Sequence, residues 1–139
     1  MTDLEIFIPQ QPFSQKRHRD GKTKSGKEYK YDPSASEKKI IKERLQFYKP
    51  PQPLTGPLVQ VIEVYFQTPQ SWSKAKQERH EGRYRPKTPD YDNIEKVYGD
   101  AMNGVIYKDD KQIVNNNTKK YYSMNPRTII RITELEPIE

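Results

Sequence analysis

Runs of β-branched and apolar residues predict three strands. Near the start, Leu4, Ile6 and Ile8 share one face of a short strand that Pro9 ends. Residues 58–66 are β-branched and aromatic with apolar side chains on both faces, which predicts a strand inside a sheet. Residues 128–136 also favour a strand, but neither face is cleanly apolar, so the pattern leaves its orientation open.

The clearest helical pattern follows Asn93. Apolar residues recur there at the spacing of an amphipathic helix, namely at Ile94, Val97, Tyr98, Ala101 and Met102. We expect Asp92 to be the N-cap, with Glu95 at the capping-box position. Asn103 and Gly104 supply the C-terminal stop.

A second helix is predicted to begin at Ser34. Glu37 follows three residues later, as in a capping box, and the Pro-rich residues 49–57 end the helix. Its apolar face is predicted to hold Ile40, Ile41, Leu45 and Tyr48.

The connecting segments are mostly polar. Residues 14–33 are basic and lack periodicity, which predicts a loop or a β-ribbon. Residues 71–87 favour a short polar helix outside the core, capped by Ser71 or Ser73. After the clear helix, residues 105–107 predict a short strand, residues 108–111 a turn and residues 112–114 the next strand.

This order of elements predicts an α/β or α+β fold. At 139 residues the chain is expected to form a single small domain, residues 1–139, in which two main helices pack on a mixed β-sheet.

The composition narrows the class of partner. A net charge of +6 together with ten tyrosines favours a polyanion that carries stackable bases, although a basic surface can also serve solubility alone. The absence of cysteine excludes disulfides, thiol catalysis and thiolate metal sites. No apolar run approaches the ~20 residues of a membrane span, and the first residues lack a signal-peptide pattern. We therefore expect a cytoplasmic protein with no membrane partner.

The charges are segregated along the chain. Residues 16–49 hold twelve Lys/Arg against five Asp/Glu, and residues 74–87 hold six against two. Residues 90–110 reverse this balance, with six Asp/Glu against two Lys. Such a pattern suits an enzyme that cleaves a phosphodiester, because cationic segments attract the polyanion and clustered carboxylates bind Mg²⁺, a hard ion that prefers oxygen ligands.

The spacing of the acidic residues supports this interpretation. On a helix with ~100° per residue, Asp92, Lys96 and Asp100 lie within ~80° of one another, opposite the apolar face. Asp90 can point to the same side in an extended approach, and Asp109 and Asp110 can fold back from the turn that follows. The alternative is structural: Asp92 only caps a helix, Lys96 pairs with it, and Asp109 and Asp110 are turn residues.

The acidic segment also matches a known motif. Residues 87–113, KTPDYDNIEKVYGDAMNGVIYKDDKQI, resemble the RusA family of Holliday junction resolvases, which are small Mg²⁺-dependent endonucleases. A weaker similarity covers residues 8–19, IPQQPFSQKRHR, and residues 71–82 resemble an insertion found in longer family members.

The resemblance implies roles for individual residues. It places the metal ligands at Asp90, Asp92 and Asp110 and the catalytic lysine at Lys96, and it also matches an acidic family position at Asp100. The implied cofactor is Mg²⁺, with Mn²⁺ as a substitute. The resemblance further implies a RusA-like fold. It also implies a homodimer, because a four-way junction is cut symmetrically on two strands by two active sites.

The basic segments are the expected contacts to the DNA backbone. The candidate residues are Lys16, Arg17 and Arg19 in the first segment and Arg83, Arg85 and Lys87 in the second. Two other functions stay open: a non-catalytic nucleic-acid-binding protein on the same scaffold, and a nuclease with less selectivity among branched DNAs.

Overall fold

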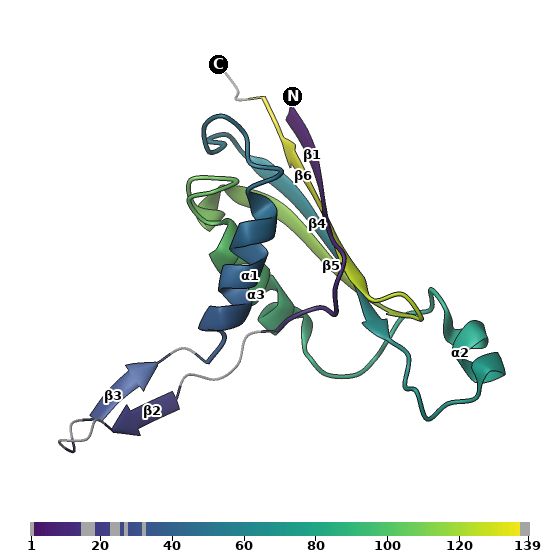
Figure 1. Ribbon diagram of the computed structural model, residues 1–139. Coiled ribbons are helices and arrows are strands. Elements are labelled where there is room, and N and C mark those ends of the chain that lie inside the picture. The colour runs from purple at the N-terminus through teal and green to yellow at the C-terminus, as the bar shows by residue number, and fades with distance from the viewer. Residues whose placement is uncertain (1, 15–18, 23–25, 27, 32, 137–139) are drawn as a thin grey trace.

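A mixed four-stranded sheet forms the centre of the protein (Figure 1). The computed structural model describes residues 2–14, 19–22, 26, 28–31 and 33–136, with the backbone alone at 2, 19–22 and 28–31. The sheet contains β1 (Thr2–Ile8), β4 (Leu58–Gln67), β5 (Ile113–Ser123) and β6 (Arg127–Glu134) in the order β1-β6-β4-β5. β6 is antiparallel to β1 and β4, whereas β4 and β5 are parallel. The expected α+β class and mixed sheet are confirmed.

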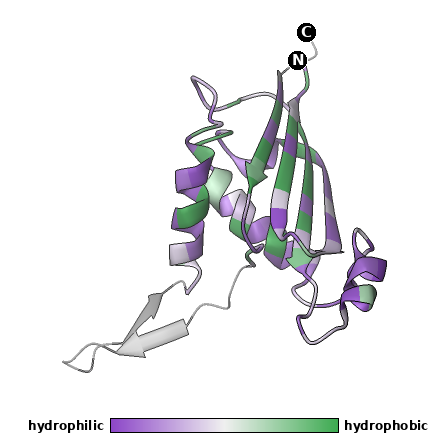
Figure 2. Cartoon of the chain, turned by 45° about the vertical axis from the view of Figure 1, so that its right-hand side comes forward, coloured by the Kyte–Doolittle hydropathy of each residue, from purple (hydrophilic) through white to green (hydrophobic). Residues whose placement is uncertain are grey.

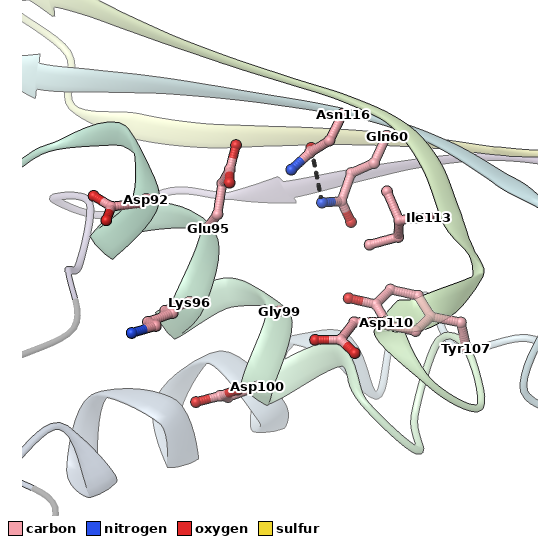
Figure 3. A pocket seen from close by; sticks show the side chains of 10 residues that line it. All are labelled: Gln60, Asp92, Glu95, Lys96, Gly99, Asp100, Tyr107, Asp110, Ile113 and Asn116. Carbon is pink, nitrogen blue, oxygen red and sulfur yellow. Dashed lines mark hydrogen bonds between the residues drawn. The ribbon is translucent and has the colours of Figure 1, made fainter.

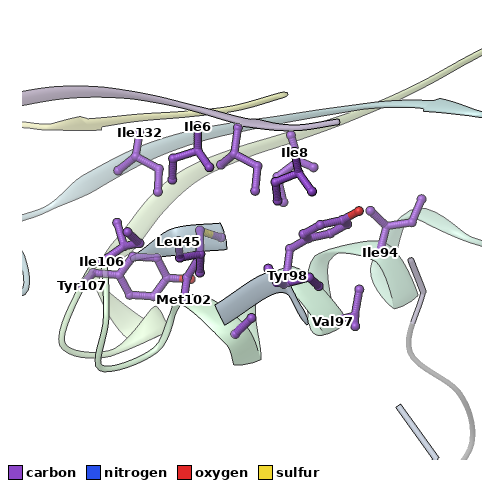
Figure 4. Close-up of a cluster of buried hydrophobic side chains, with 14 of the residues drawn as sticks. Ile6, Ile8, Leu45, Ile94, Val97, Tyr98, Met102, Ile106, Tyr107 and Ile132 are labelled. Atoms are coloured by element: carbon purple, nitrogen blue, oxygen red, sulfur yellow. The ribbon is translucent and has the colours of Figure 1, made fainter. Parts of the chain in front are cut away.

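Two helices, α1 (Ala35–Leu45) and α3 (Tyr91–Met102), pack on one face of this sheet (Figures 1 and 2). Every second residue of β4 is buried, beginning with Leu58, because strand side chains alternate between the two faces. Figure 4 shows Ile6, Ile8 and Ile132 of the sheet facing Leu45, Tyr98 and Met102 of the helices. The apolar face expected for residues 93–102 is thus the face that α3 buries.

Tyr98 joins three parts of the chain inside this core. Its hydroxyl lies 2.8 Å from Oγ1 of Thr128 in β6 and accepts a hydrogen bond of 3.1 Å from the backbone N–H of Phe13. Burial is the main reason that the pKa of Tyr98 is raised. Because its hydroxyl is fully bonded, the tyrosine fixes α3 against the sheet and against the segment after β1.

Two further elements lie outside the core. The basic segment contains an antiparallel ribbon of β2 (Arg19–Lys22) and β3 (Glu28–Tyr31), one of its two expected forms. The short helix α2 (Lys74–His80) buries none of its residues. Its N-cap, Ser73, accepts a hydrogen bond from the backbone N–H of Lys76. Within the described ranges, no helix combines the length and apolar character that crossing a bilayer requires.

The helix starts differ from the sequence predictions. α3 begins at Tyr91 with Asp90 as its N-cap, so the assignment of Asp92 as N-cap is wrong and Asp92 lies in the first turn. Ser34 is the N-cap of α1, but its side chain makes no capping hydrogen bond, so the predicted capping box does not form. Ile40 was expected on the buried face and is 43% exposed, because α1 turns Ile41 and Leu45 to the core instead.

The segment after α3 also differs. Residues 105–107 form a turn rather than a strand, with isolated bridges from Tyr107 to Leu54 and to Asn103. Gly104 has a φ of +78°, which agrees with its predicted role as a helix stop. The open orientation of the last strand is settled as well: Ile130 and Ile132 face the core, and Arg131 is exposed.

Candidate active site

A polar cavity of about 410 Å³ lies between α3 and the sheet (Figure 3). α3 supplies one wall, β4 and the start of β5 supply another, and the segment around the turn after α3 closes the end. The lining residues are Gln60, Asp92, Glu95, Lys96, Gly99, Asp100, Tyr107, Asp110, Ile113 and Asn116.

The stripe predicted on α3 is present in the cavity. Asp92, Lys96 and Asp100 all line it, each about one helical turn from the next. Asp100 also forms an ion pair of 2.9 Å with Lys38 of α1, so part of its role is to hold the two helices together. Asp92 accepts a hydrogen bond from the backbone N–H of Asn93 within the first turn.

Glu95 belongs to the site and not to a capping box. Its carboxylate accepts a hydrogen bond of 2.7 Å from the hydroxyl of Thr118 on β5. The side chain therefore crosses from α3 to the sheet and lines the cavity. The sequence pattern misassigned it because the capping-box position depends on where a helix starts, and α3 starts earlier than expected.

Asp109 and Asp110 have separate roles. Asp109 is the N-cap of a 3₁₀ turn (Asp110–Gln112) and exchanges capping-box hydrogen bonds with Gln112. The side-chain amide of Gln112 in turn donates to the backbone carbonyls of Leu54 and Gly56, at 2.8 and 3.0 Å. This anchored turn places Asp110, and not Asp109, on the cavity wall.

The electrostatics around Asp110 favour an incoming cation. The pKa of the Asp110 carboxyl is raised, first by a hydrogen bond with the Asp109 carboxyl, and then by desolvation and repulsion from Asp109 and Asp100. Carboxylates held this close repel one another, and a bound cation would relieve that repulsion.

Two buried polar atoms on the cavity wall have no hydrogen-bond partner within the described part of the chain: Oε1 of Gln60 and the hydroxyl of Tyr107. Gln60 is 2% exposed, and its amide nitrogen donates to Asn116 at 3.1 Å. The pKa of Tyr107 is strongly raised, mainly by burial and then by Asp110, so the hydroxyl keeps its proton. In Figure 3 this hydroxyl points from the far side of the cavity toward Gly99 of α3.

Unpaired buried polar atoms are uncommon, because each costs ~1–3 kcal/mol. Their position on the wall of a polar cavity indicates that a polar ligand completes their bonding. Sequence reasoning missed both residues. One signal was present, since Gln60 interrupts the otherwise apolar inward face of β4.

The loop before α3 is held by two cations. Nζ of Lys120 donates to the backbone carbonyls of Lys87 and Pro89, at 2.7 and 2.9 Å. Nη1 of Arg85 donates to the carbonyl of Thr88 at 2.6 Å. These bonds fix residues 87–89, the segment that leads directly into Asp90.

Asp90 lies outside the set of residues that line the cavity. It is the N-cap of α3, is exposed, and makes no side-chain capping hydrogen bond. Of the three ligands that the resemblance implies, Asp92 and Asp110 therefore line one cavity with Lys96, and Asp90 is not among the lining residues.

The six residues expected to contact DNA differ in exposure and in how far the structure describes them. Arg83 and Lys87 are exposed. Arg85 is half-buried with its guanidinium carbon 4.5 Å from the centroid of the Phe66 ring, and burial lowers its pKa. Lys16 and Arg17 lie outside the described residues, and Arg19 is described only by its backbone in β2.

The donor chemistry of the cavity fits Mg²⁺. Among the described residues, no three Asp, Glu or His side chains lie close enough together to form a ready-made metal cluster. Mg²⁺ does not require one, because it keeps several waters and commonly takes one or two carboxylates plus substrate phosphate. The cavity wall offers hard oxygen donors of the kind that such a hydrated ion prefers, namely the carboxylates of Asp92, Glu95 and Asp110 and the unpaired oxygens of Gln60 and Tyr107.

A small α+β domain with a cavity of carboxylates and a lysine, next to exposed basic side chains, has the parts of a nuclease. The chain belongs to the RusA endodeoxyribonuclease family, since the family model "Endodeoxyribonuclease RusA" matches residues 9–133. A relative in Bacillus subtilis (strain 168), "Uncharacterized protein YqaN", is 37% identical over 141 residues, which cover 97% of this chain and 99% of that protein. The resemblance seen in the sequence is thereby confirmed at the level of the family.

Proposed function

We propose that this protein is a divalent-metal-dependent endonuclease that resolves four-way DNA junctions in the cytoplasm, acting as a homodimer. The observation that carries the proposal is that Asp92, Lys96 and Asp110 line one cavity. Asp110 comes from a turn beyond the end of α3, so the helix alone does not account for their place on the same cavity wall.

The cavity residues have distinct roles in this proposal. Asp92 and Asp110 would hold Mg²⁺, or Mn²⁺ in its place, and Asp90 is the third candidate ligand. The bound ion supplies the Lewis acidity that phosphodiester hydrolysis needs near neutral pH. Lys96 places a positive charge where negative charge develops on the scissile phosphate or on the leaving oxygen.

The residues around the cavity bind and orient the substrate. Arg83 and Lys87 are exposed on the loop that leads into α3, and with Lys16, Arg17 and Arg19 they would contact the DNA backbone. Arg85 acts on the same DNA mainly through the loop that it holds. Each phosphate contact should add about −0.9 to the slope of log affinity against log salt. Two copies of the chain are needed because a junction is cut on two strands.

A synthetic four-way junction, incubated with Mg²⁺ or with EDTA, tests the function. We expect paired symmetric nicks that require the metal, and little cutting of forked or linear DNA at the same salt concentration. Retardation of the junction in a gel without any cutting would instead identify a non-catalytic binding protein. Equal cutting of forks would identify a less selective nuclease.

Neighbouring carboxylates provide matched variants for the site. Asp110→Asn should abolish cleavage and leave junction binding equal or tighter, because it removes a negative charge from the cavity. Asp109→Asn should keep most of the cleavage, since asparagine caps a helix as well as aspartate does. The same comparison of Asp92→Asn with Asp90→Asn decides whether Asp90 is a ligand. If both Asp92→Asn and Asp110→Asn cut the junction as well as wild type does, the proposed site is wrong.

A further inference from the structure

A second cavity, of about 450 Å³, lies beside the first at the β5 edge of the sheet. The residues of its wall that matter here are Tyr84, Arg85, Tyr91, Thr118, Lys119 and Lys120. We call it the tyrosine groove, after the two rings at its rim. Of these six residues, only Arg85 is among the expected DNA contacts, and none takes part in the proposed reaction.

Tyr84 is held in place by backbone pairing. The segment around it runs along β5, with hydrogen bonds from Gly82 N–H to Tyr122 and from Arg85 N–H to Lys120, at 2.9 and 2.8 Å. This pairing makes an isolated antiparallel bridge between Tyr84 and Tyr121. The backbone of Tyr84 is therefore held at the sheet edge and does not belong to a free loop.

The Tyr84 ring is also the end of a stack of three rings. It lies on Tyr121 with centroids 5.2 Å apart and planes 18° apart, and Tyr121 lies on Tyr65 at 4.9 Å and 21°. The guanidinium of Arg127 covers the Tyr65 ring at 3.8 Å. A further flat ring placed on Tyr84 would extend a stack that is already ordered, so little side-chain entropy would be lost on binding.

Both tyrosines of the groove are strongly exposed, Tyr84 by 70% and Tyr91 by 62%. Lys119 and Lys120 bring cations to the same groove. Exposed aromatic faces beside cations are the combination by which proteins bind single-stranded nucleic acid, in which bases stack on the rings and phosphates meet the charges. A purely apolar protein partner would not match the lysines.

The tyrosine groove is a neighbour of the first cavity, which we call the acidic cavity. Thr118 lines the groove, and its hydroxyl donates to Glu95 of the acidic cavity. Tyr91 of the groove directly precedes Asp92 of the cavity at the start of α3. A DNA strand with a phosphate at the acidic cavity can thus continue into the groove.

We propose that the tyrosine groove binds an unpaired nucleobase of the DNA strand whose phosphate occupies the acidic cavity. This inference rests on the proposed function, because that function says which DNA strand reaches the groove. Binding in the groove itself requires only an unpaired base, whether or not the strand is cut.

The test measures binding apart from cleavage. A short single-stranded oligonucleotide containing 2-aminopurine is titrated with the full-length protein in EDTA, and quenching of its fluorescence reports stacking. We expect Tyr84→Ala to weaken the quenching titration about tenfold and Tyr84→Phe to leave it unchanged, because the ring and not the hydroxyl stacks. Tyr91→Ala should weaken it as well. Phe47→Ala is the control, since Phe47 of the segment after α1 is 78% exposed and lies outside the groove.

The outcomes separate this inference from the proposed function. Quenching that depends on Tyr84 in a protein that never cuts a junction would support the groove and refute the nuclease. Normal junction cutting, with equal quenching by wild type, Tyr84→Ala and Tyr91→Ala, would overturn the groove and keep the nuclease. A loss with Phe47→Ala equal to that with Tyr84→Ala would also overturn it, and circular dichroism of each variant confirms that the fold is intact.

Discussion

Tyr107→Phe should make the metal-free protein more stable and its cation binding weaker. The change removes only the hydroxyl, which is buried on the cavity wall without a hydrogen-bond partner among the described residues. A buried unpaired polar group costs ~1–3 kcal/mol, so its removal should raise the free energy of unfolding by about 1 kcal/mol. For a domain of this size that corresponds to a rise in Tm of roughly 3–4 °C.

Tyr98→Phe is the matched control, because it makes the same chemical change at a bonded hydroxyl. The Tyr98 hydroxyl contacts Thr128 at 2.8 Å and accepts from Phe13 at 3.1 Å. Its loss leaves two partners unpaired and should lower the free energy of unfolding by ~1–3 kcal/mol. The two variants should therefore shift Tm in opposite directions, although both residues are fully buried.

The assay is thermal unfolding in EDTA and in a series of Mg²⁺ concentrations. An ion that binds the folded state raises stability by RT ln(1 + [L]/Kd), so Tm rises with Mg²⁺. We expect this rise to be smaller for Tyr107→Phe than for wild type, because the hydroxyl no longer bonds the hydration shell of the ion. Isothermal titration with Mn²⁺ should show the same loss of affinity.

Two results would refute this reasoning. A fall in Tm in EDTA for Tyr107→Phe, as large as that for Tyr98→Phe, would mean that the Tyr107 hydroxyl is already satisfied. An unchanged response to Mg²⁺ would mean that the hydroxyl does not face the ion. Either result would leave the roles of Asp92 and Asp110 to be judged by the junction assay.

Two other predictions concern cations near the cavity. Lys96→Ala should reduce junction cleavage far more than junction binding, because its charge acts on the reacting phosphate; an equal loss of both would make Lys96 a phosphate anchor instead. Lys120→Met removes two hydrogen bonds to the carbonyls of Lys87 and Pro89 and should raise the Mg²⁺ concentration needed for half-maximal cleavage, with a loss of about 1 kcal/mol in stability. Lys120→Arg should keep a Mg²⁺ requirement close to that of wild type. An unchanged Mg²⁺ requirement in Lys120→Met would argue against a positioning role.

Local periodicity predicted the elements that carry most of the site. The spacing of Ile94, Val97 and Met102 defined the buried face of α3, and this face fixed the opposite stripe of Asp92, Lys96 and Asp100. Such predictions succeed because helical neighbours are set by the ~3.6-residue repeat and do not depend on the rest of the fold. The motif further linked this stripe to Asp110 through the family resemblance.

The helix ends and short segments were predicted less well. Asp92 was expected to cap α3, and Asp90 does so; residues 105–107 were expected to be a strand, and they form a turn. A cap position is decided by a few local hydrogen bonds of ~1 kcal/mol, which packing of the following helix can override. The mistaken start also hid the bond between Glu95 and Thr118.

The sequence by itself determined the apolar face of α3, its acidic stripe and the basic segments around it, since each follows from spacing within one segment. Only the tertiary structure decided that Gln60 and Tyr107 share a wall with Asp110, and that Tyr84 ends a stack of rings beside Tyr91. These contacts depend on the parallel pairing of β4 with β5 and on the chain segment that follows the edge of β5. Pairing between distant segments gains its energy from the whole core, so no local pattern in the chain records which side chains it brings together.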